Sequence, residues 1–517
     1  MNLLSEFAWT DSGNAERLVA AHGSDLRFVR TWGRWLTWNE VFWSDDSGAV
    51  YRAAKATARA MLVEAAKIND DGRRRYATSW ATRSESRSAI EAMVSLARHE
   101  LAVAVAHERL DGDRMLLNCK NGTVDLRTGE MHAHLREDLC TKLAPVDFDA
   151  SAACPTWDAF LFRVMGGNAE MVDYLQRLAG YALTGEIREH ILAFFFGAGA
   201  NGKSTFLRTL HAVLGDYASP APRGLLFRAR GGDRHPTELA SLHGKRFVTC
   251  SEVEEGQTFD ESLTKDLTGG DPIECRRMRE DFWSFDPTHK LFVAGNHKPT
   301  VRGDDEGIWR RMRLVPWLVN LAENEQDKTL PDKLLAEAPG ILAWCVRGCL
   351  SWQHNGLSEP SAVRAATTAY REENDSLGEF FRLHVIFEVT GTIARATLRE
   401  AYEGHAKENG AQPLGAKRFT ARLRERGVGE TTVRVGTKVV QGWRGVRLAT
   451  DAERVAAVAW AQRSDVVPCS GPIIDSKQIT SRGALTDNQA LQAATLLQGG
   501  EEGLAEWLEK QGIGGAG

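Results

Sequence analysis

Residues 189 to 215 read EHILAFFFGAGANGKSTFLRTLHAVLG, and this stretch decides the fold of the chain. Its middle satisfies the pattern G-x-x-x-x-G-K-[ST], with the fixed positions at Gly197, Gly202, Lys203 and Ser204. The apolar and aromatic residues before the glycines are typical of a buried parallel strand, and the apolar spacing after them is typical of a helix. A strand, a glycine-rich turn and a helix in this order predict a loop that binds the phosphates of a nucleoside triphosphate.

The residue types of this loop predict its contacts with the nucleotide. Backbone N–H groups and the positive end of the helix dipole favour a bound phosphate. Lys203 is expected to reach the β- and γ-phosphates, and the Ser204 hydroxyl is expected to bind Mg²⁺. The expected cofactors are therefore ATP and Mg²⁺. The residues expected to hold them are Gly197, Gly199, Asn201, Gly202, Lys203, Ser204 and Thr205.

Two carboxylates follow a second apolar segment, which reads KRFVTCSEVEEG over residues 245 to 256. Glu252 and Glu254 lie two positions apart, so in an extended chain their side chains point to the same side. One could polarise the attacking water while the other holds a water bound to Mg²⁺. Because Ser251 stands where an Asp is common, the division of roles stays open, with Glu252 the first choice for base and metal partner. A solvated acidic turn is the alternative.

A third apolar segment ends in Asn296, and a fourth begins after Arg310 and Arg311. Ligands of open α/β sheets bind at the carboxyl ends of the strands, where the Asn296 amide could hydrogen-bond the γ-phosphate and the attacking water. A guanidinium at position 310 or 311 could act as an arginine finger on the nucleotide of a neighbouring subunit. Two ordinary surface arginines are the alternative.

Residues 263 to 285 read LTKDLTGGDPIECRRMREDFWSF and contain two short strand-like segments around a charged turn. This pattern predicts a hairpin whose basic residues contact nucleic-acid phosphates. An ordinary exposed hairpin is the alternative. The candidate contacts are Lys265, Arg276, Arg277 and Arg279.

The order of these motifs resembles that of the superfamily 3 helicases, AAA+ ATPases of small viruses, phages and plasmids. The chain is most similar to the helicase part of the phage and plasmid primase–helicases, a family that also includes the poxvirus replication primase. The resemblance spans residues 10 to 450, roughly, and rests on strings such as KDLTGGDPIECR, FVAGNHKPTVRGDDEGIWRRM and NCKNGTVDLRTGEMHAH. It implies a hexameric ring, ATP-driven translocation on single-stranded DNA, and a DNA-contacting hairpin.

Composition limits where DNA could bind. The 517 residues carry a formal charge of −5, so DNA contact must come from local basic patches. No apolar run approaches the ~18–20 residues of a membrane span, and the polar start MNLLSEFAWTDSGN does not read as a signal peptide. The eight cysteines include no C-x-x-C pair and fit a reducing cytosol. We expect a cytoplasmic protein of a phage or mobile element in a bacterial host, without a membrane partner.

The regions around the core predict further domains. Residues 1–150 form an α+β domain that opens with a helix capped by Asp11 or Ser12. Its tryptophan-rich β segment favours a small core over base stacking. His132, His134 and Cys140 lack the spacing of a structural zinc site. The segment PVDFD has no surrounding chain large enough for a primase fold, so the primase half of many relatives is expected to be absent.

The rest of the chain divides into four parts by the same reasoning. We expect an ATPase core over 155–320, a helical connector over 321–375, a winged-helix-like DNA-binding domain over 376–450, and a helical, partly flexible tail over 451–517. The helix GAKRFTARLRERG reverses the overall charge locally, and a basic surface packed against the ring is the alternative. Its candidate DNA contacts are Lys417, Arg418 and Arg422.

Taken together, the sequence predicts an α/β fold: an AAA+ type P-loop ATPase core with a mixed α+β N-terminal domain and a C-terminal winged-helix-like domain. The predicted function is an ATP-dependent replicative DNA helicase acting on single-stranded and forked DNA, with a separate primase as a further partner. One alternative is an AAA+ origin-binding or loader ATPase without unwinding activity. Another alternative is a monomeric kinase or GTPase. The sequence contains no N-K-x-D string, the guanine-specificity motif, which argues against a GTPase.

Overall fold

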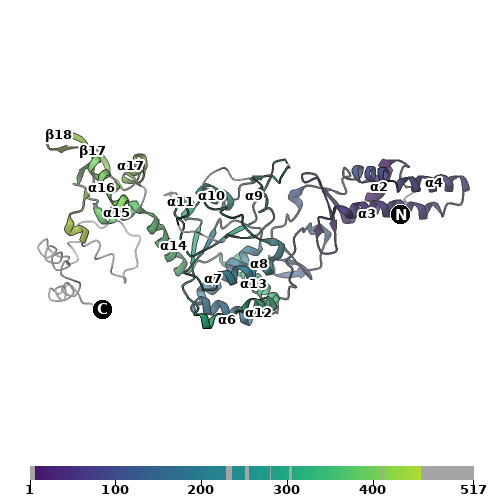
Figure 1. Ribbon diagram of the computed structural model, residues 1–517, viewed down its shortest axis with the longest axis horizontal. Coiled ribbons are helices and arrows are strands. Elements are labelled where there is room, and N and C mark those ends of the chain that lie inside the picture. The colour runs from purple at the N-terminus through teal and green to yellow at the C-terminus, as the bar shows by residue number, and fades with distance from the viewer. Residues whose placement is uncertain are drawn as a thin grey trace. The chain divides into compact units, whose positions relative to one another are not determined.

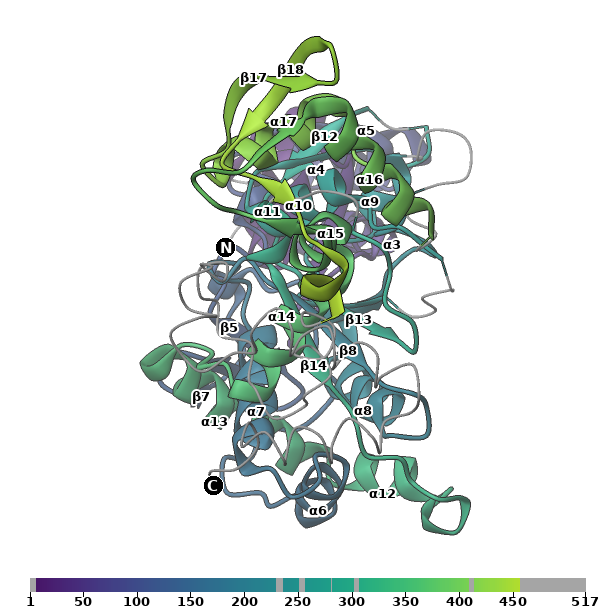
Figure 2. The same cartoon turned by 90° about the vertical axis from the view of Figure 1, so that its left-hand side faces the viewer.

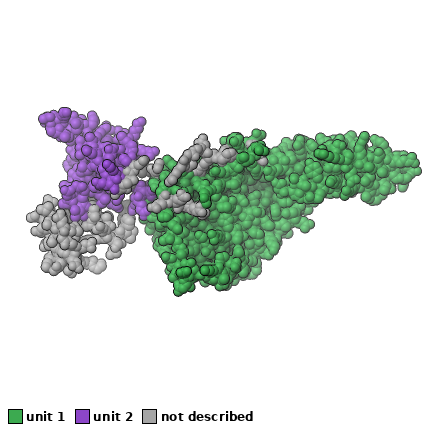
Figure 3. Space-filling model, viewed as in Figure 1, with its two compact units in different colours: residues 1–370 green, residues 371–517 purple. Residues whose placement is uncertain are grey.

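The computed structural model describes residues 6–228, 236–250, 256–279, 281–301, 306–408 and 413–455. These residues form a mixed α/β structure with a parallel sheet, which confirms the predicted fold class in this general form. The chain divides into two units, residues 1–370 and 371–517, which are coloured separately in Figure 3. The finer predicted division into five parts remains a prediction.

The first unit opens with a small four-stranded sheet and its helices, of which α2, α3 and α4 are labelled in Figure 1. The strand order is β3-β2-β1-β4, and Trp35, Trp38 and Trp43 are buried, as expected for tryptophans that form a core. The elements are α2 (Asp11–His22), β1 (Leu26–Val29), β2 (Arg34–Trp38), β3 (Trp43–Ser44), α3 (Ser47–Ala65), α4 (Asp71–Ser84), α5 (Arg87–Ala97) and β4 (Ala104–Val105).

The cap of helix α2 differs from the prediction. The Thr10 hydroxyl accepts a hydrogen bond from the Gly13 N–H at 3.0 Å, so Thr10 is the N-cap. The predicted caps, Asp11 and Ser12, lie inside the helix, and that prediction is wrong. All three residue types are good N-caps, so residue type alone could not choose between them.

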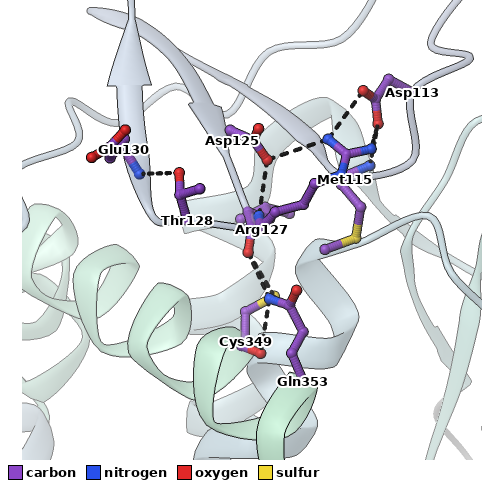
Figure 4. A network of polar contacts seen from close by, with 9 residues as sticks. Asp113, Met115, Asp125, Arg127, Thr128, Glu130, Cys349 and Gln353 are labelled. Atoms are coloured by element: carbon purple, nitrogen blue, oxygen red, sulfur yellow. Dashed lines mark hydrogen bonds and ion pairs between the residues drawn. The ribbon is translucent and has the colours of Figure 1, made fainter.

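A second, three-stranded sheet contains β5 (Leu116–Cys119), β6 (Gly122–Asp125) and β7 (Glu130–His132). Figure 4 shows how it joins helix α13 (Ala338–Asn355). The Arg127 guanidinium pairs with Asp113 at 2.7 Å and with Asp125 at 3.3 Å. The Gln353 amide donates to the Leu126 carbonyl at 2.7 Å. These contacts fix the turn between β6 and β7 on the helices of the core.

The central sheet has five parallel strands in the order β14-β8-β13-β10-β9. In the register of this sheet, Phe196 of β8 lies between Gly295 of β13 and Pro316 of β14. The carboxyl ends of these strands therefore meet at one edge, where α/β sheets bind ligands. The strands are β8 (Leu192–Phe196), β9 (Ala218–Pro220), β10 (Phe247–Cys250), β13 (Lys290–Gly295) and β14 (Met312–Pro316).

Helices cover this sheet, and α7 and α13 lie side by side in both Figure 1 and Figure 2. A Cβ on Gly180 of α7 would lie 2.0 Å from the Cys349 nitrogen, so only glycine permits this close crossing. The helices are α6 (Pro155–Val164), α7 (Ala169–Leu183), α8 (Lys203–Leu214), α9 (Pro236–Ala240), α10 (Glu261–Gly269), α11 (Glu306–Trp309), α12 (Leu330–Ala336), α13 and α14 (Ser361–Asn374).

Two buried cations sit at the carboxyl end of helix α7. Arg246 donates to the Leu183 carbonyl at 2.6 Å, and Lys290 donates to the Thr184 carbonyl. The last carbonyls of a helix carry partial negative charge, which offsets part of the cost of burying these cations. Burial still lowers the pKa of Lys290 well below its usual value. We assign both cations a structural role at the amino edge of the sheet.

The second unit contains, in chain order, a helix, two short strands, two helices and an antiparallel β-hairpin. The two long strands of this hairpin, β17 and β18, pair along their full length. The elements are α15 (Ser376–His384), β15 (Val385–Ile386), β16 (Thr392–Ala394), α16 (Arg395–Glu408), α17 (Ala416–Glu425), β17 (Gly429–Val435), β18 (Lys438–Arg444) and β19 (Arg447–Leu448).

No single described helix is long and apolar enough to cross a membrane; the pair Glu323–Ala336 and Ala338–Asn355, bent by 76°, passes on length and composition only. In the described part of the chain, no three His, Cys, Asp or Glu side chains form a group that could hold a metal ion.

Candidate functional site

The loop from 197 to 202 connects β8 to α8 in a conformation that requires glycine. Gly202 has φ +87°, a left-handed value that favours glycine. A Cβ at this position would also lie 2.8 Å from Val164 and 2.9 Å from Phe160. At Gly197, a Cβ would lie 2.2 Å from the Trp317 carbonyl oxygen. The glycines of the motif are thus needed both for the turn and for the close approach of helix α6 and the segment after β14.

Lys203 is the first residue of α8, and its ammonium group points back into the loop. It is only 5% exposed. Its Nζ donates to the Gly197 carbonyl at 2.7 Å, to Asn201 Oδ1 at 3.0 Å and to Asn296 Oδ1 at 3.3 Å. Burial lowers the pKa of Lys203 to about 8, so the group remains mostly protonated at neutral pH. A charged donor held among neutral oxygens is suited to binding an anion.

The other loop residues are held from behind by the segment after β14. The Asn201 amide donates to the Trp317 carbonyl at 3.1 Å, and the Leu321 N–H donates to the Ala200 carbonyl at 2.8 Å. Ser204 is exposed and Thr205 is half-buried, both in the first turn of α8. Ser204 follows Lys203 in the chain and its side chain is accessible, as expected for a ligand of a nucleotide-bound Mg²⁺.

Asn296 is the first residue after β13, and the structure brings it to the loop. Its hydrogen bond to Lys203 joins two residues that are 93 positions apart. The predicted carboxylates Glu252 and Glu254, including the predicted metal partner Glu252, lie outside the described residues. Strand β10 ends at Cys250 beside β13, so the chain enters that segment from the same edge of the sheet.

Lys298 is a further cation at this edge that the sequence argument missed. Its Nζ lies 4.9 Å from the ring centre of Phe196, the last residue of β8, and 5.7 Å from that of Tyr370. Cation–π contacts of this kind hold an ammonium group in place. The sequence did hold a hint, because Lys298 is two residues beyond Asn296 at the tip of the same strand.

Arg310 and Arg311 lie at the opposite edge of the sheet from the loop. Met312, the first residue of β14, pairs with Leu192 at the start of β8, while the loop follows Phe196. Four strand residues, about 13 Å of rise, separate the two edges. Arg310 is exposed, whereas Arg311 is 8% exposed and donates to the Gly307 carbonyl at 2.8 Å. The two arginines are therefore not equivalent.

The predicted hairpin is present, with β11 (Ile273–Cys275) antiparallel to β12 (Trp283–Phe285). Lys265 is not part of it: it lies on α10, whose N-cap Asp260 accepts the Leu263 N–H at 3.2 Å, so its assignment to the hairpin is wrong. Arg279 is exposed in the turn with φ +64°.

The side chains of the hairpin turn differ in their surroundings. The Arg276 guanidinium lies 4.9 Å from the ring of Phe282, which is itself 53% exposed. Met278 is also exposed, at 66%. Exposed aromatic and basic side chains together suit stacking on bases and contact with phosphates. The sequence argument named only the basic members of this group.

Arg277 is packed into an aromatic cluster instead of extending freely toward solvent. Its guanidinium lies 5.4 Å from the ring of Trp32 and 5.7 Å from that of Trp283. His107 Nε2 donates to the Ser284 carbonyl at 3.2 Å, and the imidazole ring meets that of Trp283 at 90°. The base of the hairpin is thus fixed to the N-terminal sheet region, and Arg277 is half-buried. Its contact with DNA stays a prediction.

His243 completes this cluster, with its ring centre 5.0 Å from Trp283. Burial is the main cause that lowers the pKa of His243 to about 4; Lys142, Arg277 and His107 add to it and Asp111 opposes it. In the unfolded chain the group titrates near 6.5. Between these two pH values the unfolded chain binds more protons, so acidification favours unfolding.

We expect the replacement His243→Phe to weaken the acid sensitivity of the protein. The variant keeps an aromatic ring against Trp283 but has no group to protonate. Thermal unfolding at pH 7 and pH 5 is the measurement, and the difference in Tm between the two pH values should shrink by a few degrees. His354→Gln, at an exposed position on α13, is the control and should behave like wild type. An unchanged pH dependence in His243→Phe would contradict the assignment.

The basic residues of the second unit fall into two groups. Lys417 and Arg418 are exposed on α17. Arg422 pairs with Glu425 at 3.0 Å, and Arg424 pairs with Glu430. Such pairs cancel part of the positive charge that the sequence pattern suggested. The tip of the β17–β18 hairpin adds the exposed valines Val435 and Val439, at 53% and 66%.

Comparisons with known proteins match two regions of the chain. Residues 15–166 match the family described as D5 N terminal like, and residues 195–311 match a family of unknown function (DUF5906). A protein of Acanthamoeba polyphaga mimivirus, named as a helicase, is 27% identical over 316 residues, which cover 57% of this chain and 33% of that protein. A protein of African swine fever virus, named as a primase, is 21% identical over 305 residues, which cover 54% of this chain and 32% of that protein. Together, these matches support a primase–helicase family member.

The second match covers the residues of the site. It begins at Phe195 in β8 and ends at Arg311, directly before β14, so it includes the loop, the hairpin and Asn296. The matches span about one third of the length of these two relatives. Among solved structures, the apo C-terminal region of NrS-1 aligns with a TM-score of 0.45 and 11% identity, over 84% of this chain and 99% of that chain.

Proposed function

We propose that this primase–helicase family member is an ATP-dependent replicative DNA helicase with an AAA+ type P-loop core, and that ATP binds in the loop from Gly197 to Thr205. The observation that carries the proposal is the Lys203 ammonium group, buried in the loop and hydrogen-bonded to Asn296 from the neighbouring strand. A lysine at a helix start and an amide at an adjacent strand tip provide converging contacts to the γ-phosphate end of a triphosphate.

Each residue of the site then has a defined task. Lys203 exchanges its carbonyl partners for the β- and γ-phosphates, and the Ser204 hydroxyl would hold Mg²⁺, which neutralises phosphate charge when bound. Asn296 is released from Lys203 and can orient the attacking water toward the γ-phosphate. We keep Glu252 as the proposed base, with Glu254 as its alternative.

The position of Arg310 supports an oligomer. Because it lies at the edge opposite the loop, its guanidinium cannot serve the nucleotide of its own chain. A ring, for which the resemblance implies six subunits, would bring Arg310 of one copy to the loop of the next. Arg311 is the weaker candidate for this role, because it is buried and bonded within its own chain.

The exposed turn of the hairpin is the proposed contact with single-stranded DNA. We expect Arg279→Ala to reduce unwinding of a forked duplex by about tenfold or more while basal ATP hydrolysis stays near wild type, because the change removes a phosphate contact of the motor and leaves the loop intact. A fluorescent strand-displacement assay, run beside ATP hydrolysis without DNA, is the measurement. Arg208→Ala, an exposed arginine on α8, is the matched control.

The unwinding assay also separates the two leading functions. If wild-type protein hydrolyses ATP but displaces no strand on any fork, the helicase proposal is wrong and a loader or origin-binding ATPase replaces it. A helicase half that works with a separate primase is compatible with the limited coverage of the relatives, one of which is named as a primase.

The second unit is the proposed winged-helix-like contact with duplex DNA. We expect the double replacement Lys417→Ala and Arg418→Ala to lower the slope of log affinity against log salt by about 0.9 per lost phosphate contact. Arg422→Ala should change the slope less, because that guanidinium already pairs with Glu425. Duplex affinity at several salt concentrations tests this. Equal slopes for wild type and the double variant would mean that α17 does not bind DNA.

A further inference from the structure

The side chain of Tyr370 contacts two segments of the proposed catalytic site, the one that follows Asn296 and the one that precedes Arg310. It lies on α14 and is 1% exposed. Its hydroxyl donates to the Pro299 carbonyl, and its ring meets that of Trp309 at 5.3 Å and 81°. Pro299 is three residues beyond Asn296, and Trp309 immediately precedes Arg310. A single buried ring therefore joins the segment at the loop edge of the sheet to the segment at the opposite edge.

Helix α14 is fixed to the sheet independently of Tyr370. The Leu314 N–H on the open side of β14 donates to the Thr367 hydroxyl at 3.0 Å. Arg313 of the same strand pairs with Glu359, just before the helix. Tyr370 also lies 6.2 Å from the ring of Phe194 in β8. The helix thus serves as a fixed support, and Tyr370 is the point at which the two segments meet it.

Lys298 adds a third contact on the nucleotide side. Its ammonium group lies over both Phe196 and Tyr370. If Lys298 moves when a γ-phosphate binds, its cation–π contact with the Tyr370 ring changes as well. Removing the tyrosine hydroxyl would leave the buried Pro299 carbonyl without this donor. The ring contacts with Trp309 would remain.

We propose that Tyr370 is a positioning residue that couples the γ-phosphate end of one nucleotide site to the arginine facing the next subunit. The segment from Asn296 to Pro299 responds to the nucleotide, and Tyr370 transmits its position through Trp309 to Arg310. This inference rests on the proposed function. It assigns to α14 the task of relating ATP binding in one subunit to hydrolysis in its neighbour.

The test compares Tyr370→Phe with Tyr217→Phe in the full chain. Both tyrosines are 1% exposed and both hydroxyls take part in a hydrogen bond, Tyr370 with the Pro299 carbonyl and Tyr217 with the Asn118 N–H at 3.1 Å at the other end of the sheet. For Tyr370→Phe we expect kcat for ATP hydrolysis to fall on the order of tenfold while ATP affinity changes less than about twofold. Tyr217→Phe should keep both values, even if its Tm falls equally.

Double-mutant cycles then identify what Tyr370 acts through. Tyr370→Phe is combined with Asn296→Ala and, separately, with Arg310→Ala. Coupling predicts that each pair loses less activity than the product of the two single losses. Independent, multiplicative losses in either cycle would overturn the proposal, as would a parallel loss of affinity and kcat in Tyr370→Phe. Failure of the proposed function would look different, because wild type itself would then hydrolyse no ATP.

Discussion

Lys203→Ala is expected to abolish ATP hydrolysis, lowering kcat by about 1,000-fold or more. The ammonium group supplies charge to the β- and γ-phosphates, and losing such a contact in a dry site costs several kcal/mol in the transition state. The same ammonium group donates to Gly197, Asn201 and Asn296, so its removal also takes the donor from these three acceptors. Phosphate release from purified full-length protein at saturating ATP is the measurement.

The control for this prediction is Arg208→Ala on the same helix. Arg208 is exposed, one turn beyond the phosphate end of α8, and its removal should leave hydrolysis within about twofold of wild type. If Lys203→Ala protein folds normally and still hydrolyses ATP at the wild-type rate, the loop is not the catalytic site.

Arg310→Ala is expected to bind ATP normally and to hydrolyse it on the order of 1,000-fold more slowly, the range that arginine fingers contribute. Its position at the far edge of the sheet predicts that the loss can be repaired by another subunit. Mixing Arg310→Ala with Lys203→Ala protein should restore part of the activity, because some interfaces then pair an intact loop with an intact arginine. Hydrolysis by the mixture, with co-assembly measured in parallel, tests this.

Arg311→Ala provides the contrast within the same dipeptide. Since Arg311 is buried and bonded to Gly307, its loss should lower the Tm and should not be repaired by mixing. A mixture of Arg310→Ala and Lys203→Ala that co-assembles and stays inactive would contradict action between subunits.

Much of the site follows from local sequence patterns. The strand, glycine-rich loop and helix appear where the spacing of residues 189 to 215 predicts them, because each element is specified by residues close in sequence. The contact between Lys203 and Asn296 is long-range, yet it follows from one rule: parallel strands end at the same edge.

Other features depend on partners that a local pattern does not contain. Arg277 reads as one more basic residue of a hairpin, and only the fold shows that Trp32, far earlier in the chain, packs on its guanidinium. The same holds for Arg311, whose burial depends on the packing of α11. The helical position of Lys265 could have been predicted from the sequence. Asp260 followed by apolar residues at helical spacing is a typical helix start.

ATP hydrolysis by the wild-type chain, compared with and without single-stranded DNA, is the decisive measurement for the proposed motor. A motor that binds ATP in the loop and DNA through the hairpin turn predicts steady-state hydrolysis that single-stranded DNA stimulates several-fold, with both rates lost in Lys203→Ala. No hydrolysis under either condition, or hydrolysis that neither DNA nor the Lys203→Ala change affects, would contradict it.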